Sequence, residues 1–298
     1  MTTIPALLSF PARGPLLGEL QSLLVRRGGG YKLRPTVERE RLYNLVLELR
    51  KEGLSYNAII ERVKAERGVT LRKSHVSEWT NGKHRPFGYV RAFDAKPCPE
   101  LAYVIGVKMG DASLSMSRNY QYILKLRVID REFAEEFSRC LSVILRRSPP
   151  RVKWHEKTKA WHTELSSLLL YNFLRQPLRD LKRVVEDSVD CSAAFLRGFF
   201  DSEGWVYSME LGVVNTNMET LRYVSKLLES RFGIRVLGPR LKRKGGRMVM
   251  IKGKLYHANK DCYSLLVERS SLSAYRSAVG FTIRRKQQRL ASAVAKLA

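Results

Sequence analysis

The sequence predicts an α+β fold in which two pseudo-symmetric αββαββα units follow a small all-α domain. Two observations lead to this prediction. A helical segment rich in small and apolar residues occurs twice, beginning at Leu101 and at Ala194, and each copy is followed by strand-like runs and a further helix. Ahead of them, three short helices are expected. The predicted divisions are a flexible arm over 1–35, the all-α domain over 36–96, a first repeat over 97–188 and a second over 189–298.

Length, composition and charge suit a folded protein with an anionic partner. The 298 residues are enough for one large and one small domain, and 44% of them are hydrophobic. Lysine and arginine number 54 against 28 aspartates and glutamates, a net charge of +26. Nucleic acid is the first candidate partner, because phosphate contacts dominate its binding. A generally basic surface without a specific partner is the plain alternative, and a membrane ranks last because no apolar run has spanning length.

The cysteine pattern and the N-terminus favour a cytoplasmic protein. The cysteines are Cys98, Cys140, Cys191 and Cys262. Their wide spacing without a CxxC pair predicts four isolated, reduced thiols. Pro5 and Pro11 interrupt the short apolar stretch at the N-terminus, and no positively charged region precedes it, so no secretory signal is predicted.

The three helices expected over 36–96 resemble a helix-turn-helix module. Apolar residues recur at helical spacing from Leu42, Gly53 ends this first helix, Ser55 is a good N-cap for the second, and the third carries Trp79 inward. On this interpretation the third helix offers side chains to a DNA major groove. These side chains are Arg72, Lys73, Ser74, His75 and Ser77. The alternative is a plain three-helix bundle with a solvated charged face. A linker is expected over 87–99.

Each repeated helix carries small residues one turn apart. They are Ala102, Gly106 and Gly110 in the first copy, and Ala194, Gly198 and Ser202 in the second. Glycine inside a helix costs about 1 kcal/mol relative to alanine. That cost is accepted where two backbones must approach closely. We therefore expect the two helices to pack against each other at Gly106 and Gly198.

Packing of this kind would bring Asp111 and Glu203 together at the two helix ends. A carboxylate at a helix C-terminus opposes the helix dipole by about 0.3–1 kcal/mol, and two adjacent carboxylates repel each other. A divalent cation between them reverses the sign of this interaction, and oxygen ligands around partly hydrated Mg²⁺ suit phosphodiester chemistry. A solvated helix end would explain one such acid. Two acids at equivalent positions of a repeat argue against that explanation.

The segments LAYVIGVKMGDASL and AFLRGFFDSEGWV resemble the paired motifs of the LAGLIDADG homing endonucleases. The catalytic acid of that motif falls on Asp111 and Glu203, and its helix-contact glycines fall on Gly106 and Gly198. The resemblance extends from near Glu100 to the C-terminus. It implies a saddle-shaped fold whose sheets lie on a long double-stranded DNA target, and cleavage of both strands. It also implies two or more Mg²⁺ ions shared at the two acids.

The resemblance also carries departures and further candidates. Ala112 replaces the glycine that usually follows the acid, and Lys108 lies within the first motif helix. The family often places a lysine or glutamine near each metal. Candidates for such an auxiliary catalytic role are Lys125 and Arg127 on a strand, Asn217 after the matching strand, and Arg285 or Lys286 late in the chain.

A basic, turn-rich segment in each repeat is expected to contact DNA. Residues 235–260 hold nine lysines and arginines and no acid, and Gly245-Gly246 is the predicted turn of a two-stranded ribbon that fits a major groove. Solvated turns of a basic protein are the alternative. The predicted contacts are Arg151, Lys153 and Lys157 in the first repeat, and Arg240, Lys242, Arg243, Lys244, Arg247, Lys252 and Lys254 in the second.

Together these features lead us to expect a homing endonuclease, free-standing or intron-encoded. It should act as a monomer without an obligate protein partner, because both motifs lie in one chain. One alternative is a transcription regulator built on the same scaffold. Such a regulator would be expected to lack the metal-binding acids, and both acids are present in this sequence. An RNA-splicing maturase is a further alternative. An intein is not expected, since the sequence starts with Met1 and lacks a terminal His-Asn.

Overall fold

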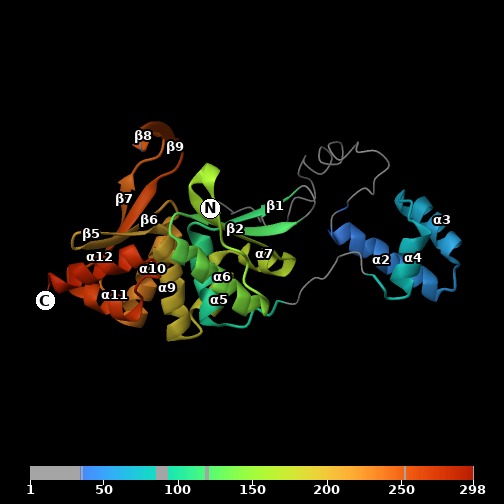
Figure 1. Ribbon diagram of the computed structural model, residues 1–298, viewed down its shortest axis with the longest axis horizontal. Coiled ribbons are helices and arrows are strands. Elements are labelled where there is room, and N and C mark those ends of the chain that lie inside the picture. The colour runs from blue at the N-terminus through green and yellow to red at the C-terminus, as the bar shows by residue number, and fades with distance from the viewer. Residues whose placement is uncertain (1–33, 35, 85–92, 118–120, 252, 298) are drawn as a thin grey trace, which may run out of the picture. The chain divides into compact units, whose positions relative to one another are not determined.

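The computed structural model describes residues 34, 36–84, 93–117, 121–251 and 253–297 (Figure 1). These residues belong to two compact units that separate within the segment 85–92. The predicted arm over 1–35 lies outside the described residues apart from Arg34. No helix in the described part of the chain combines the length and apolar character needed to cross a membrane.

The first unit is a three-helix domain, as the sequence predicted. It consists of α2 (Thr36–Lys51), α3 (Tyr56–Arg67) and α4 (Lys73–Thr80). Ser55 caps α3 by accepting a backbone N–H bond from its first turn, and Gly68 ends that helix in the left-handed conformation with φ 63°. The three helices enclose a small core of their own, which includes Val46, Ile59, Val63, Val76 and Trp79.

The second unit contains the two αββαββα repeats that the sequence predicted. The first repeat comprises α5 (Pro99–Met109), β1 (Ser113–Met116), β2 (Tyr122–Val128), α6 (Arg131–Leu145), β3 (Lys153–His155), β4 (Ala160–Ser166), α7 (Leu168–Leu174) and α8 (Leu178–Val185). The second comprises α9 (Val189–Glu203), β5 (Gly204–Tyr207), β6 (Glu210–Asn215), α10 (Met218–Phe232), β7 (Val236–Arg243), β8 (Arg247–Ile251), β9 (Lys254–Ala258), β10 (Cys262–Val267), α11 (Leu272–Ala278) and α12 (Arg284–Ala295).

Each repeat folds one four-stranded antiparallel sheet, and the two sheets have the same topology. Their strand orders are β1-β2-β4-β3 and β5-β6-β10-β7, so corresponding strands occupy corresponding places. Alternation along a strand gives each sheet a buried face and an open face. In β2, for example, Leu124 and Leu126 are buried, whereas Lys125 and Arg127 lie on the opposite face. The open faces are therefore available to a partner.

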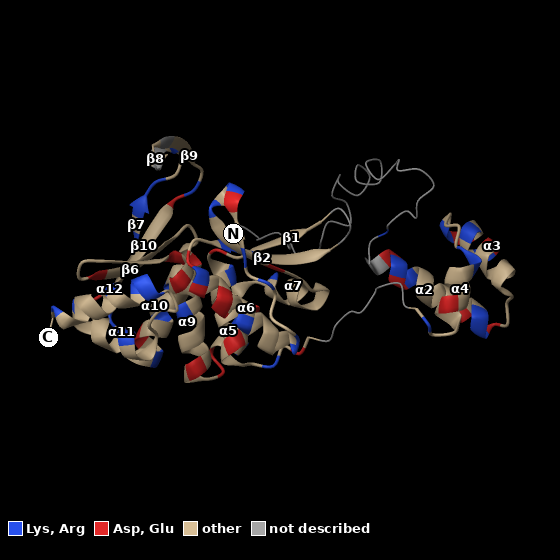
Figure 2. Cartoon of the chain, viewed as in Figure 1, with Lys and Arg blue, Asp and Glu red and all other residues tan. Residues whose placement is uncertain are grey.

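The second repeat differs from the first by an extended hairpin. The turn predicted at Gly245-Gly246 is wrong, because these glycines instead separate β7 from β8 on the same side of the hairpin. Strands β8 and β9 pair with each other as a separate two-stranded ribbon, and the chain reverses between Ile251 and Lys254. Figure 2, which labels β10 as well as β7, shows this ribbon beyond the ends of these two strands. The glycine pair had suggested a turn because glycine tolerates positive φ, and Gly246 does adopt φ 77°.

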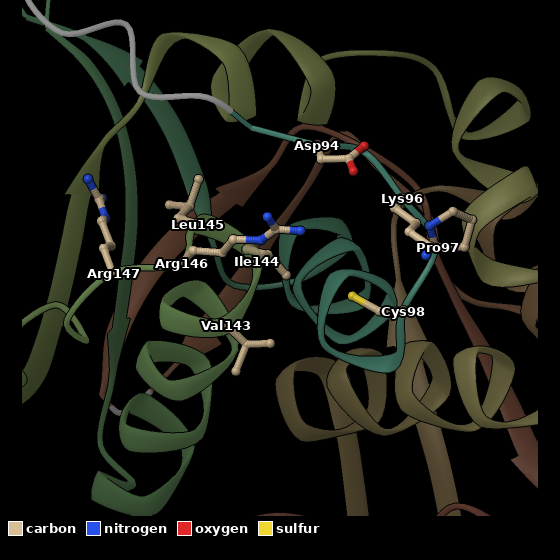
Figure 3. Close-up of a pocket in the computed structure, with 9 residues that line it drawn as sticks. All are labelled: Asp94, Lys96, Pro97, Cys98, Val143, Ile144, Leu145, Arg146 and Arg147. Carbon is tan, nitrogen blue, oxygen red and sulfur yellow. The ribbon is translucent and has the colours of Figure 1, made fainter.

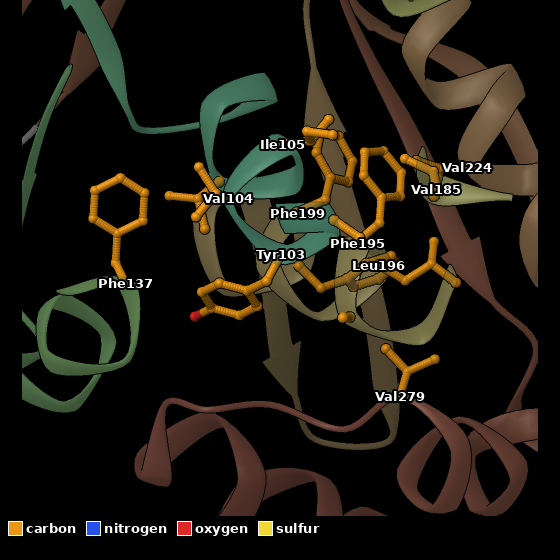
Figure 4. Packing of buried hydrophobic residues seen from close by; sticks show 14 of the residues in the cluster. Tyr103, Val104, Ile105, Phe137, Val185, Phe195, Leu196, Phe199, Val224 and Val279 are labelled. Atoms are coloured by element: carbon orange, nitrogen blue, oxygen red, sulfur yellow. The ribbon is translucent and has the colours of Figure 1, made fainter. Parts of the chain in front are cut away.

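Helices α5 and α9 form the centre of the second unit. Both are apolar around most of their circumference, because they pack against each other and against the rest of both repeats. Figure 4 draws part of this core around α5, including Ile105, Phe195 and Phe199. All four cysteines are free thiols, as expected. Cys140 and Cys191 are buried, whereas the other two are only partly buried.

Candidate active site at the paired helix ends

Glycines permit a close contact between α5 and α9. A Cβ atom at Gly106 would overlap the carbonyl oxygen of Phe195 and would stand 2.9 Å from the backbone nitrogen of Phe199. A Cβ atom at Gly198 would likewise overlap the carbonyl oxygen of Tyr103. The obstructing atoms are backbone atoms, which cannot rotate away. Only glycine therefore allows this helix spacing at the two positions.

The close packing brings the two helix ends together with their acids. Asp111 follows the C-cap residue Gly110 of α5, and Glu203 is the last residue of α9. A Cβ atom at Gly110 would stand 3.1 Å from Cγ of Glu203, so the two ends are in contact. Partial burial, together with the negative charge of Asp111, raises the pKa of Glu203 to about 7. Loss of hydration around its carboxylate at the helix end also raises the pKa of Asp111. Two ionised carboxylates are therefore disfavoured here unless a cation is present.

An amide from β6 contacts the second acid. Asn215 Nδ2 donates a hydrogen bond of 3.2 Å to Glu203 Oε1. The sequence had instead suggested Asn217, whose exposed side chain caps α10 by accepting a 3.1 Å bond from the backbone N–H of Thr220. Asn217 thus acts as a helix cap, whereas Asn215 is the amide that contacts Glu203. Asn215 is the last residue of β6 and Asn217 lies two residues beyond it, so the sequence spacing alone did not distinguish them.

The first repeat has no matching amide. Gly204 pairs with Val213 in the second sheet, and Ser113 pairs with Lys125 in the first. When Asp111 is aligned with Glu203, these registers make Val128 the counterpart of Asn215. Val128 is buried and apolar, so the two acids have different neighbours.

Lys286 contributes a buried positive charge next to the acids. Its side chain is 6% exposed, and Nζ donates hydrogen bonds to the carbonyl oxygens of Phe200 at 3.1 Å and Asp201 at 2.6 Å. These carbonyls belong to the last turn of α9, the turn that carries Glu203. Burial lowers the pKa of Lys286 to about 8. Its charge in turn lowers the pKa values of Asp111 and Glu203, against the effect of burial. The sequence-based candidate Lys286 therefore lies close to the acid pair, and its hydrogen bonds go to the backbone of α9.

Asp201 is a buried acid that the sequence analysis missed. It is 1% exposed and accepts hydrogen bonds from Tyr103 Oη at 3.0 Å and from the backbone N–H groups of Thr282 at 3.0 Å and Ile283 at 3.4 Å. Burial raises its pKa to about 6, although these hydrogen bonds oppose the shift. Asp201 thus ties α9 to α5 and to the start of α12.

The residues that follow Ile283 bind the first repeat. Arg285 forms two hydrogen bonds to Asp130, of 2.7 and 2.8 Å, and the backbone N–H of Arg284 donates to Glu132 Oε1 at 3.0 Å. Asp130 and Glu132 lie at the start of α6. The segment 282–286 therefore contacts both repeats, which fixes their relative position beside the acids.

The other auxiliary candidates lie on the open face of the first sheet. Lys125 Nζ is 3.6 Å from Glu164 Oε2, and in the β1–β2 ladder Lys125 is opposite Ser113, two residues after Asp111. Arg127 is exposed, and His162 is its cross-strand neighbour. These positions suit contact with a ligand on the sheet surface.

The basic residues predicted to bind DNA are mostly exposed. Figure 2 shows basic residues along β7. The exposed members of the predicted set are Arg151, Lys153, Lys157, Arg240, Lys242, Arg243, Lys244 and Arg247. Lys252 lies outside the described residues, and Lys254 begins β9 with a side chain that is not described. Lys242 Nζ lies 5.7 Å from the ring centroid of Trp205.

In the first unit, the predicted DNA contacts fall into two groups. Arg72, Lys73 and Ser74 are exposed at the start of α4. His75 is partly buried and stacks on Trp79, with ring centroids 6.1 Å apart. Ser77 is also partly buried, and its Oγ accepts a hydrogen bond from the side chain of Asn81. The first group is free to meet a groove, whereas the second also supports the helix.

A separate hollow of about 710 Å³ lies between the end of α6 and the segment leading into α5 (Figure 3). Arg146 and Arg147 line it on one side, and Asp94 and Cys98 on the other. Cys98 precedes the first turn of α5, whereas Asp111 follows the last turn. The hollow is therefore at the opposite end of this helix from the acids and is not part of the acid site.

The acid pair offers the donor atoms that a hard divalent cation prefers. Among the described residues, no group of three or more histidine, cysteine, aspartate or glutamate side chains is placed to hold a metal ion. Mg²⁺ in proteins commonly uses one or two carboxylates and completes its shell with water and substrate phosphate. Asp111 and Glu203 match that smaller donor set, and their raised pKa values mean that ionising both carboxylates is disfavoured unless a cation lies beside them.

Comparison with known proteins identifies the family of this chain. The family described as LAGLIDADG-like domain matches residues 190–280. Protein MJ0398 of Methanocaldococcus jannaschii is 34% identical over 253 residues, which cover 84% of this chain and 91% of that protein. MJ0314 of the same organism is 25% identical over 181 residues, covering 57% of this chain and 66% of that protein. The chain belongs to the LAGLIDADG family.

Solved structures with a related fold include a nuclease and a second kind of protein. The homing endonuclease I-DmoI in complex with DNA and Mn is 16% identical, with a TM-score of 0.44, and the match covers 61% of this chain and 96% of that chain. Full-length DUF199/WhiA from Thermatoga maritima is 13% identical, also with a TM-score of 0.44, and the match covers 70% of this chain and 64% of that chain.

Proposed function

We propose that this protein is a site-specific homing endonuclease that cuts both strands of a long DNA target with Mg²⁺. The observation that carries the proposal is the meeting of Asp111 and Glu203 at equivalent helix ends, with both pKa values raised. This arrangement costs stability in the absence of a cation. Natural proteins commonly accept such a cost at a functional site.

The roles of the side chains follow from their contacts. Asp111 and Glu203 would hold the metal ions, which supply activation of water and stabilisation of the leaving oxygen when bound. Asn215 orients the carboxylate of Glu203 through its 3.2 Å hydrogen bond. Lys286 holds the last turn of α9 and limits the repulsion between the two acids.

We assign residues 97–188 and 189–298 to the two halves of the target, which meet the DNA through the open faces of their sheets. Both acids lie in one chain, so the enzyme would act as a monomer. Residues 36–96 would add affinity through the start of α4 without contributing to the chemistry. The charge of +26 matches a long stretch of phosphates.

Binding and cleavage are tested separately. A randomised duplex library is first bound to the protein in EDTA, and the retained sequences are determined. The selected duplex is then incubated with the protein in Mg²⁺, and its ends are mapped on both strands. We expect double-strand cleavage at one position, and complete loss of cleavage when EDTA removes the metal, with binding retained.

A protein that selects one sequence but never cuts it in Mg²⁺ or Mn²⁺ would contradict the proposal. That outcome would favour the transcription regulator. Selective binding to folded RNA, with no duplex selected, would instead favour the maturase.

The first unit is expected to contribute affinity alone. Arg72→Ala and Lys73→Ala each remove one exposed cation at the start of α4. Each should weaken target binding. The slope of log Kd against the logarithm of the salt concentration should also fall by about 1, as expected for one lost phosphate contact. Cleavage at saturating protein should be unchanged, as it should be for a chain that begins at Pro97.

The matched control is Lys51→Ala, which removes an exposed cation from the end of α2. It should leave the salt dependence as it is. An unchanged salt dependence in both α4 variants, or a lost cut in a folded chain beginning at Pro97, would contradict this role.

A further inference from the structure

The ribbon formed by β8 and β9 exposes an apolar face. Met250 pairs with Leu255, and Met248 pairs with His257. Because cross-strand partners share a face and alternate residues return to it, Met248, Met250 and Leu255 lie together. Their exposed fractions are 54%, 66% and 58%. We call these three side chains the apolar ribbon face.

Such a face indicates a partner. A two-stranded ribbon is marginal on its own, and exposed clusters of large apolar side chains on a small protein usually mark an interaction site. The ribbon forms its own two-stranded sheet, separate from the four-stranded sheet of its repeat. The apolar ribbon face therefore gains stability chiefly by binding something else.

The charges around the ribbon identify the class of partner. Lys242, Arg243, Lys244 and Arg247 are exposed where β7 leads into β8. From residue 236 to residue 260 the sequence has no acid. The next residue, Asp261, accepts a 2.7 Å hydrogen bond from the backbone N–H of Gly245 at the base of the ribbon. A basic stem beside an exposed apolar face suits a polyanion that also displays apolar groups.

We propose that the apolar ribbon face lies in the major groove of double-stranded DNA and contacts thymine methyl groups. A two-stranded ribbon fits this groove, which is about 12 Å wide, and the C5-methyl of thymine is the apolar group displayed there. Methionine is flexible enough to follow such a surface. The stem cations meet the flanking phosphates, and the ribbon prefers A·T pairs.

This inference changes the expected recognition by the second repeat. The sequence had suggested that lysine and arginine along the whole segment contact DNA. Among the described side chains, the cations gather at the stem, and Met250 and Leu255 occupy the far part of the ribbon. The inference rests on the DNA-binding part of the proposed function and is independent of cleavage.

The experiment removes the methyl group from the DNA and the apolar side chains from the protein. Anisotropy measures binding of the full chain to three alternating duplexes of equal length, dA-dT, dA-dU and dG-dC, at fixed salt. The wild-type protein should bind dA-dT more tightly than dA-dU. We expect about fourfold for each methyl group buried, which corresponds to about 0.8 kcal/mol.

Two variants and one control isolate the ribbon. The double variant Met250→Ala/Leu255→Ala should bind dA-dT and dA-dU equally, with its affinity for dA-dU unchanged. Lys242→Ala should instead weaken binding to all three duplexes by the same factor. Val143→Ala, at an exposed position on α6, should behave as the wild-type protein does.

Three results would overturn the proposal. Equal binding of dA-dT and dA-dU by the wild-type protein would show that the methyl groups are not contacted. Sedimentation of the wild-type protein as two chains, reduced to one by the double variant, would make a second copy the partner. Absence of binding to all three duplexes would overturn both this inference and the proposed function. Loss of cleavage with the methyl preference retained would count against the nuclease alone.

Discussion

Asp111→Asn and Glu203→Gln should each abolish double-strand cleavage and leave binding of the selected duplex largely intact. Each substitution removes one of the two negative charges that would hold the metal ions, and it keeps the size and polarity of the side chain. DNA affinity should persist because the proposed DNA contacts are the open sheet faces and their cations, which neither substitution alters. The measurement is cleavage of both strands together with Kd in EDTA.

The same substitutions should stabilise the metal-free protein. The pKa of Glu203 is about 7 in the folded protein, above its ordinary value of 4.5. A raised carboxyl pKa means that the folded state prefers the protonated form, so stability is fully present below 4.5 and falls as pH rises through about 7. Glu203→Gln removes this loss. At pH values above the pKa of Glu203 in the folded protein, the Tm of this variant in EDTA should therefore exceed that of the wild-type protein. The difference should disappear at acid pH.

Mg²⁺ should reverse this order. A ligand that binds only the folded state raises its stability, so the metal should raise the Tm of the wild-type protein and not that of either variant. Glu210→Gln is the matched control, because it neutralises an exposed acid at the other end of β6. It should cut normally and should not change the response of Tm to metal. Full cleavage by Asp111→Asn or Glu203→Gln would contradict the assignment of the acid pair.

The parts of this site that repeat in the sequence could be predicted from it. Small residues one turn apart indicated the contact at Gly106 and Gly198, and the same alignment selected Asp111 and Glu203. Repetition made these inferences possible, because each position was seen twice in a similar setting. The same holds for helix α10, the further helix that was expected after the second copy.

The parts that occur once could not be predicted in this way. Asp201 is an acid inside an amphipathic pattern, and its partners are backbone N–H groups of residues 282 and 283, far away in the chain. Asn215 ends β6 and contacts Glu203, whereas Asn217 lies just beyond the strand and caps α10. Lys286 could be named as a candidate, but its bonds to the carbonyls of α9 depend on how α12 packs. Long-range packing decides each of these contacts.

The contact between α5 and α9 leads to the second large expected effect. Gly198→Leu should lower the stability markedly and abolish cleavage, because its Cβ would overlap the carbonyl oxygen of Tyr103 and the rest of its side chain would enter the interface. Overpacking in a core costs about 1–3 kcal/mol, and more where neighbours cannot move. Here the obstructing atom belongs to a helix backbone, so α5 as a whole must move away. Urea unfolding of the two proteins measures the difference.

A graded series separates this contact from a general intolerance of apolar bulk. Gly198→Ala adds only the Cβ atom and should cost less than Gly198→Leu, while still reducing cleavage. Val189→Leu enlarges a side chain on the exposed first turn of the same helix, where Val189 is 54% exposed, and it should change neither property. A Gly198→Leu protein that is as stable and active as its parent would contradict the contact.

The number of chains on one target tests the same arrangement without a substitution. Both acids come from one chain and meet through Gly106 and Gly198, so one protein molecule carries both halves of the site. Sedimentation of the wild-type protein on its selected duplex should therefore give one chain per target. Two chains on one target would mean that each contributes a single acid, and the loss of activity in Gly198→Leu would then need another cause. Suppose that one chain binds each target and that the variants at Gly198 show graded losses. The distance between α5 and α9 would then determine both the stability of the protein and the placement of the two acids.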